Sequence, residues 1–373
     1  MSTARALRVG LVSTAARDQP GSMRAYSETL RQALELHAPD IDAQLVELAP
    51  TTASGPIAQR LQLLTLPLKA RFRGGSTPDV WHVLDGSRAY VARGLRGAPV
   101  VVTVHDIIPW LQAQGRFAGA PAIGAAAHWL WRRNARAMRN AAALICVSHS
   151  TESDTRESFG VATQACHVVA SPLPRGLSGE LGRSSEVQRE AGSMLHVGHN
   201  GFYKNRAQAL RIFARLDRSL ARQLVMIGPP PTAELIALAD ALGIHTQLRW
   251  LGDADDAVLA GWYRRSAVLL FPSLYEGYGW PVLEAMAFGL PVVCSNAGSL
   301  PEVAGDVVPC VAPDDIDGFV AHIELLLREP ARAAAAGAAG LRRAAEFSSE
   351  RFAREMGAVY RSAAATRGER MQG

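Results

Sequence analysis

The feature that most constrains the fold is a regular alternation of short apolar runs with helical segments along the chain. The runs share a high content of Val, Ile and Leu. They lie at 7–13, 43–48, 79–84, 99–105 and 143–148, and again at 193–199, 222–228, 247–252, 266–272, 291–294 and 307–311. Nearly continuous apolar character suits strands of a parallel sheet that is buried on both faces. The segments between them, such as 22–37 and 120–140, have helical patterns, so the sequence predicts a doubly wound α/β fold.

One segment interrupts this alternation. Residues 171–190 are rich in Pro, Gly and Ser and lack periodicity, which is typical of a linker between domains. We therefore expect two Rossmann-like domains, an N-terminal one over 1–175 and a C-terminal one over 190–349. The last helical pattern, at 350–366, has one apolar face and is expected to pack back on the first domain. Ligands of such sheets bind outside the carboxyl ends of the strands, so the two domains are predicted to face each other across a binding cleft.

The composition excludes several classes of protein. The chain has 373 residues, of which 48% are hydrophobic and 20% charged, unlike disordered, collagen-like or disulfide-scaffold proteins. Its four cysteines have no metal or redox spacing and are interpreted as reduced core thiols. The start lacks the pattern of a signal peptide, and no apolar run approaches the ~18 residues of a membrane span. These features predict a cytoplasmic protein, attached at most to the inner face of the membrane.

The charge is concentrated in the N-terminal half. Residues 1–180 hold 19 Lys and Arg against 13 Asp and Glu, whereas residues 181–373 hold 20 against 21. Two stretches, 60–73 and 126–140, mix basic residues with Leu, Phe or Trp and contain no acid. They are interpreted either as a solvated basic face or as a contact with an anionic membrane surface or a lipid-diphosphate acceptor. No helix-turn-helix, zinc or RNA-binding signature accompanies the charge, so no nucleic acid is expected as a partner.

The chemistry is concentrated in a turn that follows the apolar run at 266–272. The sequence Leu-Tyr-Glu-Gly-Tyr-Gly-Trp-Pro occupies 274–281, and a helix is predicted from 281 to 288. Glycines let the backbone approach a ligand, and the start of a helix offers N–H groups that suit a phosphate or a sugar oxygen. Glu276 lies on the turn and Glu284 lies eight residues later. Each carboxylate can accept hydrogen bonds from two vicinal hydroxyls, so a polyhydroxylated phosphate ester is the predicted ligand.

Two further strand ends carry candidate residues. A glycine-bearing turn after the run at 193–199 leads to Lys204 at the start of a helix, which suits a diphosphate. The run at 99–105 ends in His105, which is predicted to hydrogen-bond a sugar or assist proton movement. None of these strand ends carries an Asp-x-Asp pattern, so no metal and no cofactor is expected.

With these motifs, the segment 271–293 (FPSLYEGYGWPVLEAMAFGLPVV) resembles the retaining GT-B glycosyltransferases of family 4. The resemblance extends from about residue 7 to 350. It implies that Glu276 binds the hydroxyls of the donor sugar and acts with His105 as a catalytic residue, while Glu284 holds the ribose of the nucleotide. It also implies that the backbone of four residues holds the sugar and the β-phosphate. These residues are Gly277, Tyr278, Gly279 and Trp280.

The resemblance to the family is less close in the turn that is predicted to bind the diphosphate. Lys204 occupies the position of a lysine of the family, but His199 stands where many members carry an arginine. Arg206 is therefore a candidate to assist Lys204 in donor binding. Gly21 occupies a loop that, in related enzymes, lies beside the phosphates and the acceptor.

The resemblance implies transfer of a hexose with retention of anomeric configuration and without a metal. The departing phosphate would take the proton of an acceptor that attacks from the same face. GDP-mannose is the first donor expected, with UDP-glucose and UDP-N-acetylglucosamine as alternatives, and the acceptor would be a glycan or a lipid-linked saccharide. Other functions remain open: a nucleotide-sugar epimerase or phosphorylase on the same scaffold, a partner subunit without activity, and a nucleic-acid-binding protein.

Overall fold

The structure is a computed structural model that describes residues 5–15, 21–48, 56–72, 76–181, 188–252 and 254–372, without the side chains of 56–63 and 367–372. It divides into two units, one made of Met1–Arg175 and Ser348–Gly373 and the other of Gly176–Phe347. The two units are joined twice, because the chain leaves the first unit and returns to it. None of the helices in the described part of the chain is long and apolar enough to cross a membrane.

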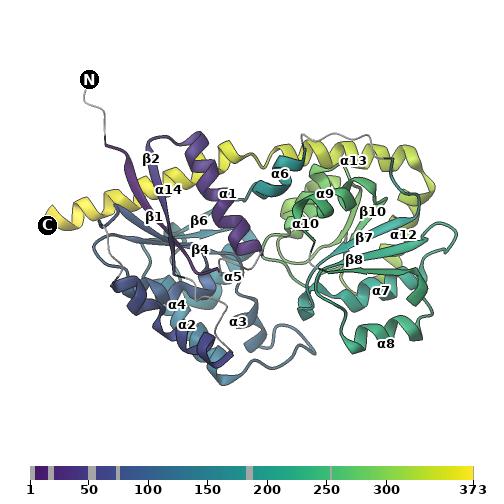
Figure 1. The fold of residues 1–373 in the computed structure, drawn as a ribbon, viewed down its shortest axis with the longest axis horizontal. Helices are drawn as coiled ribbons and strands as arrows, with labels where there is room; N and C mark the ends of the chain where they lie inside the picture. The colour runs from purple at the N-terminus through teal and green to yellow at the C-terminus, as the bar shows by residue number, and fades with distance from the viewer. Residues whose placement is uncertain are drawn as a thin grey trace. The chain divides into compact units, whose positions relative to one another are not determined.

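The first unit is built on a six-stranded parallel sheet in the order β2-β1-β3-β4-β5-β6. Its strands are β1 Leu7–Ser13, β2 Ile41–Glu47, β3 Val80–Val83, β4 Val100–Val104, β5 Ala143–Cys146 and β6 Cys166–Val168. Its helices are α1 Ser22–His37, α2 Pro56–Arg71, α3 Ile108–Ala113, α4 Ala125–Arg139, α5 His149–Phe159 and α14 Ser349–Gln372, with 3₁₀ helices η1 Gly86–Gly94 and η2 Thr163–Ala165. Helices α1 and α14 cover one face of the sheet, and α2, α3 and α4 lie on the other side (Figure 1).

The second unit repeats the design, with the strand order β12-β11-β10-β7-β8-β9. Its strands are β7 Ser193–Val197, β8 Gln223–Ile227, β9 Leu248–Leu251, β10 Val268–Phe271, β11 Val292–Ser295 and β12 Cys310–Val311. Its helices are α6 Arg175–Leu181, α7 Arg206–Arg215, α8 Ala233–Ala241, α9 Asp256–Arg265, α10 Trp280–Ala287, α11 Leu300–Ala304, α12 Ile316–Arg328 and α13 Pro330–Ala345, with 3₁₀ helices η3 Phe202–Lys204, η4 His245–Gln247 and η5 Gly305–Val307. Helices α7 and α8 lie on one face of the sheet and α9 and α10 on the other (Figure 1).

The two sheets confirm the predicted α/β fold of doubly wound parallel sheets. The central strands are buried on both faces, which is why they appear in the sequence as apolar runs. The structure differs from the prediction in detail. Helix α4 begins at Ala125 rather than at 120, after Pro121 and Gly124, and α6 occupies part of the segment expected to be a linker. All four cysteines are free, as predicted. Cys146 and Cys294 are buried, but Cys166 and Cys310 are only partly buried, so the prediction of a core thiol is wrong for these two.

Helix α14 is fixed to the first unit by a buried polar network as well as by its apolar face. The hydroxyl of Tyr360 lies 2.7 Å from Nδ1 of His82, and Nε2 of the same ring lies 2.7 Å from Oγ1 of Thr103. Tyr26 of α1 completes the network, with its hydroxyl 3.1 Å from the Thr103 hydroxyl. Burial lowers the pKa of His82 to about 3, so the ring is neutral and bonds as a neutral partner. The last long helix of the chain is therefore part of the core of the N-terminal unit.

Candidate functional site

The glycine turn predicted to bind a ligand lies between β10 and α10. Gly279 immediately precedes the helix with a φ of 101°, a left-handed conformation that favours glycine. A side-chain carbon at this position would also collide with Leu300. No side chain caps the helix, and Pro281 occupies its first turn. The positive end of the α10 dipole at this turn favours a phosphate or a sugar oxygen.

Glu276 lies on this turn, and its carboxylate is held by three hydrogen bonds. Lys204 donates from Nζ to both carboxylate oxygens, at 2.8 and 2.9 Å, and the Ser273 hydroxyl donates to Oε1 at 2.7 Å. The ion pair is largely buried, with side-chain exposures of 11% for Lys204 and 8% for Glu276. A lysine ammonium has three N–H donors, and two of them are used here, which leaves one for a further acceptor. The pair thus offers carboxylate oxygens that can accept hydrogen bonds from hydroxyls, and beside them an N–H that can donate to a phosphate.

Lys204 reaches Glu276 because two loops are joined by hydrogen bonds. Leu274 donates its N–H to the carbonyl of Tyr203 at 2.7 Å, and the Asn205 amide donates to the carbonyl of Pro272 at 3.0 Å. Asn205 has a φ of 52°, a left-handed conformation that asparagine tolerates better than most residues. The turn after β7 is in this way fixed against the turn after β10, and the lysine is positioned before any ligand arrives.

The backbone of Glu276 is held from its other side by the loop that follows β11. The N–H and the hydroxyl of Ser299 both donate to the Glu276 carbonyl, at 3.1 and 3.0 Å. Gly298 has a φ of 58° and lies against the backbone of Glu276, where a side-chain carbon would collide. Ser273 and Ser299 were not among the predicted site residues. Ser299 reaches Glu276 from a loop 23 residues further along the chain, whereas Ser273 lies only three residues before it.

Glu284 is buried in the middle of α10 and is bonded to a residue that the sequence did not indicate. The Tyr263 hydroxyl of α9 donates to Oε2 of Glu284 at 2.6 Å. Burial raises the pKa of Glu284 to about 7, while the bond from Tyr263 acts in the opposite direction. The group proposed to hold a ribose therefore ionises near neutral pH.

This raised pKa predicts a pH-dependent stability. Between the ordinary value of 4.5 and about 7 the folded chain binds the Glu284 proton more tightly than the unfolded chain, so stability falls as the pH rises through this window. At 1.36 kcal/mol per pKa unit, the cost above pH 7 is about 3 kcal/mol. The variant Glu284→Gln removes it while keeping an acceptor for Tyr263. Urea unfolding should show a variant more stable than the wild type by about 3 kcal/mol at pH ~8 and by almost nothing at pH ~4. A difference that is constant with pH would contradict the assignment.

His199 lies in the turn after β7, and Arg206 begins α7. The N–H of Gly201 donates to Nδ1 of His199 at 2.8 Å, so Nε2 carries the proton and donates to the Tyr203 hydroxyl, also at 2.8 Å. Burial lowers the pKa of His199, and the charge of Lys204 lowers it further. The neutral ring cannot replace the charge of an arginine. Arg206 is 4% exposed and donates to Asn200 and, at 2.9 Å, to the Pro229 carbonyl. It therefore links the turn after β7 to the segment that follows β8.

His105 follows β4 in the N-terminal unit and is partly buried. Its Nε2 donates to the Leu84 carbonyl at 2.9 Å, and its ring packs edge-on against Tyr26 at 4.6 Å. Burial lowers the pKa of His105, although Asp85 and the Leu84 carbonyl oppose this effect. The imidazole is neutral near pH 7, and its Nδ1 is left as an acceptor. The neighbouring Asp106 accepts from the N–H of Ile108 at 3.0 Å, a bond that caps the following turn.

Two family descriptions match the two halves of the chain. Glycosyl transferases group 1 matches residues 182–343, which include Lys204, Glu276 and Glu284. Glycosyltransferase Family 4 matches residues 45–173, which include His105.

The chain belongs to the family 4 glycosyltransferases.

Several curated relatives of this glycosyltransferase transfer mannose according to their names. An MMP alpha-(1->4)-mannosyltransferase of Mycolicibacterium hassiacum is 34% identical over 72% of this chain and 66% of its own. O-antigen chain mannosyltransferase B of Escherichia coli is 45% identical over 28% of this chain and 27% of its own. The chain thus spans no more than 66% of the length of these two relatives.

Solved structures share the fold of this glycosyltransferase. A sucrose-phosphate synthase from Thermosynechococcus elongatus superposes with a TM-score of 0.74 at 19% identity, over 96% of this chain and all of that one. Anabaena HepE in complex with UDP and glucose gives a TM-score of 0.69 at 15% identity, over 95% of this chain and all of that one. The fold is the GT-B fold, as the sequence predicted.

Of the remaining predicted site residues, three lie in the turn before α10 or at its start, and Gly21 lies at the start of α1. Gly277 is buried in the turn, while Tyr278 and Trp280 are partly buried at the start of α10, with the Tyr278 ring edge-on to Phe347 at 6.4 Å. Gly21 lies exposed at the start of α1 with an extended φ of 170° and open space around it. Neither its conformation nor its surroundings require a glycine.

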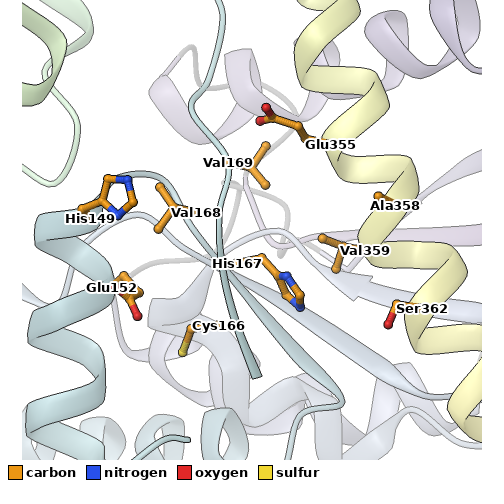
Figure 2. Close-up of a pocket in the computed structure, with 10 residues that line it drawn as sticks. All are labelled: His149, Glu152, Cys166, His167, Val168, Val169, Glu355, Ala358, Val359 and Ser362. Atoms are coloured by element: carbon orange, nitrogen blue, oxygen red, sulfur yellow. The ribbon is translucent and has the colours of Figure 1, made fainter. Parts of the chain in front are cut away.

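A separate pocket of about 690 Å³ lies in the N-terminal unit of this glycosyltransferase. Figure 2 shows His149 and Glu152 of α5 on one side, Glu355, Val359 and Ser362 of α14 on the other, and Cys166 and His167 of β6 between them. Within the described ranges, no group of three His, Cys, Asp or Glu side chains is close enough to hold a metal ion. None of the predicted site residues lines this pocket, so it is not the candidate donor site.

Proposed function

We propose that this glycosyltransferase moves a hexose from a nucleoside diphosphate sugar to a glycan or lipid-linked saccharide. The buried pair of Lys204 and Glu276 at the start of α10 is the observation that supports this most directly. The carboxylate offers acceptors for sugar hydroxyls, and the ammonium offers its third N–H to a phosphate. Because both groups are held before the ligand binds, little reorganisation opposes catalysis.

GDP-mannose is the first donor that we propose. The names of the mannosyltransferase relatives support the sugar, while the base is an inference from the family resemblance. A UDP-sugar is the second candidate, since the structurally similar HepE has been solved with UDP-glucose. Glu284 would accept hydrogen bonds from the ribose hydroxyls of either nucleotide, in its ionised form.

The proposed reaction breaks the bond between the anomeric carbon and the β-phosphate oxygen and forms one to the acceptor oxygen on the same face. The acceptor proton passes to the departing phosphate. Lys204 and the start of α10 stabilise the charge that develops on the diphosphate, in the role that a metal ion plays in other transferases. His105 would contribute a neutral imidazole that hydrogen-bonds the sugar.

A thermal-shift screen with GDP, UDP, ADP and their sugars tests the donor site. Stabilisation by GDP and GDP-mannose is expected, by about 2.7 kcal/mol at a concentration 100 times the dissociation constant. The same nucleotides should shift Glu284→Gln less, because one ribose acceptor becomes an amide. A shift by uridine nucleotides alone would select the second candidate, and no shift by any nucleotide would reject the proposed site.

The reaction type is tested with the preferred donor. Transfer should persist in EDTA, and the product should keep the anomeric configuration of the donor sugar by NMR. Conversion of the donor without an acceptor would indicate an epimerase, and conversion only with inorganic phosphate would indicate a phosphorylase.

A further inference from the structure

A surface of the N-terminal unit is strongly basic, and its exposed cations are not among the predicted site residues. It is formed by α2, η1 and α4, and we call it the basic face. No Asp or Glu occurs within 56–72, 86–97 or 125–140. The exposed cations within these ranges are Lys69, Arg71, Arg93, Arg96, Arg132, Arg136 and Arg139. None of them forms an ion pair with a carboxylate of the described residues, so their charge is available to an external partner.

The two long helices of the basic face are held together through η1. Gly94 of η1 packs so closely on the carbonyl of Pro67 in α2 that a side chain there would collide with it. Asn134 of α4 donates to the Ser87 carbonyl at 2.7 Å and accepts from the N–H of Tyr90 at 3.1 Å. Both helices lie on the same side of the first sheet (Figure 1). Their outward sides therefore form parts of one surface.

Apolar side chains also project from the basic face. Leu64, Leu68 and Phe72 follow each other at intervals of four residues, which places them along one side of α2. Their exposed fractions are 56%, 57% and 75%. On α4, Trp129 is 48% exposed and lies under the guanidinium of Arg133, whose Cζ is 4.6 Å from the ring centre. Exposed apolar side chains beside cations suit the boundary between the headgroups and the acyl chains of a membrane.

We propose that the basic face docks on the surface of an anionic lipid bilayer. Lipid phosphates would meet the unpaired cations, and the leucines and Phe72 would enter the boundary between headgroups and acyl chains. Trp129 suits the same depth, since its ring is apolar and its N–H is polar. A nucleic acid would match the charge but would give the leucine stripe nothing to contact. An acidic protein is a third possible partner, but the stripe and the tryptophan favour lipid.

Vesicle flotation tests the proposal without any donor or acceptor. The full chain should float with phosphatidylcholine vesicles that contain phosphatidylglycerol, and it should not float with phosphatidylcholine alone. Each basic residue near an anionic surface contributes about fivefold to binding, so Arg132→Gln with Arg136→Gln should weaken it roughly 30-fold. The matched control is Arg211→Gln with Arg215→Gln, which removes two exposed arginines at the same spacing from α7. The control should bind like the wild type.

A second pair of substitutions tests the apolar contribution. Leu68→Ser with Phe72→Ser should reduce vesicle binding at least about tenfold at low salt, because two apolar side chains no longer leave water. Raising the salt from ~0.1 M to ~1 M should release most of the wild type, since the Debye length falls from about 10 Å to about 3 Å. All variants should retain the circular dichroism of the wild type, which shows that they are folded.

Three results would overturn the proposal: no flotation with anionic vesicles at low salt, equal binding to neutral vesicles, or equal loss in the control pair. Binding to single- or double-stranded RNA without binding to vesicles would assign the basic face to nucleic acid instead. Because flotation does not depend on the donor site, these outcomes are independent of those for the proposed function.

Discussion

Replacing Glu276 with alanine is expected to lower kcat/KM for sugar transfer by about 10²–10³-fold, as for the loss of one preorganised polar group at a reacting centre. The change removes the acceptors proposed for the sugar hydroxyls, and it releases Lys204 from both of its carboxylate bonds. Lys204 would still meet the diphosphate. Affinity for the free nucleotide should therefore change by only a few fold, while affinity for the nucleotide sugar should fall by about 10–100-fold. Calorimetric titration with each ligand separates the two effects.

The control for Glu276 is Glu234→Ala, which removes an exposed carboxylate from the first turn of α8 in the same unit. It should keep wild-type turnover. Glu276→Gln retains one acceptor oxygen, so its kcat/KM should lie between those of the wild type and Glu276→Ala. Near wild-type turnover of Glu276→Ala would refute the donor-site assignment. A parallel loss of nucleotide and nucleotide-sugar affinity would instead indicate that Glu276 acts only by holding the turn.

The second large effect is on stability. Lys204→Met should destabilise the chain by about 3–5 kcal/mol, because it leaves the carboxylate of Glu276 buried without its counter-ion. The double variant Lys204→Met with Glu276→Gln removes both charges and keeps the Ser273 bond. It should recover most of the lost stability and remain without transfer activity. Urea unfolding of the wild type, both single variants and the double variant gives the coupling energy directly.

Arg215→Met provides the comparison for an exposed ion pair. Arg215 lies 3.0 Å from Asp317, with side-chain exposures of 63% and 80%. Its loss should cost no more than about 1 kcal/mol, the range measured for surface pairs. If Lys204→Met costs as little as this, the buried pair does not organise the turn. If the double variant is as unstable as the single one, the destabilisation comes from lost lysine packing rather than from an unpaired charge.

The sequence predicted the fold because the strands of the parallel sheets are buried on both faces and appear as apolar runs. It was less informative for helices. The segment that forms α2 carries apolar residues on most sides and a proline at position 67, so it has no clear helical face. Its fold depends on packing against η1. The helix predicted over 120–140 begins only at Ala125, because Pro121 and Gly124 do not favour a helix before it.

The candidate site was predictable as separate residues and not as an arrangement. Glu276 and Lys204 each stood out beside a glycine turn, but 72 residues separate them and their pairing depends on the bond from Leu274 to Tyr203. Tyr263 had no signal in the sequence, because a tyrosine in a helix is ordinarily a core residue. The departure at His199 was visible, yet its neutral state follows from the bonds to Gly201 and Tyr203.

The return of α14 to the first unit affects how relatives can be recombined. The unit that contains Lys204, Glu276 and Glu284 is inserted into the other, between Arg175 and Ser348. A chimaera that exchanges donor specificity must therefore be spliced at both of these points. A single crossover after Arg175 would combine the sheet of one parent with the α14 of the other. The contact between Tyr360 and His82 would then join residues from two different parents. Recombination at two junctions keeps that core intact.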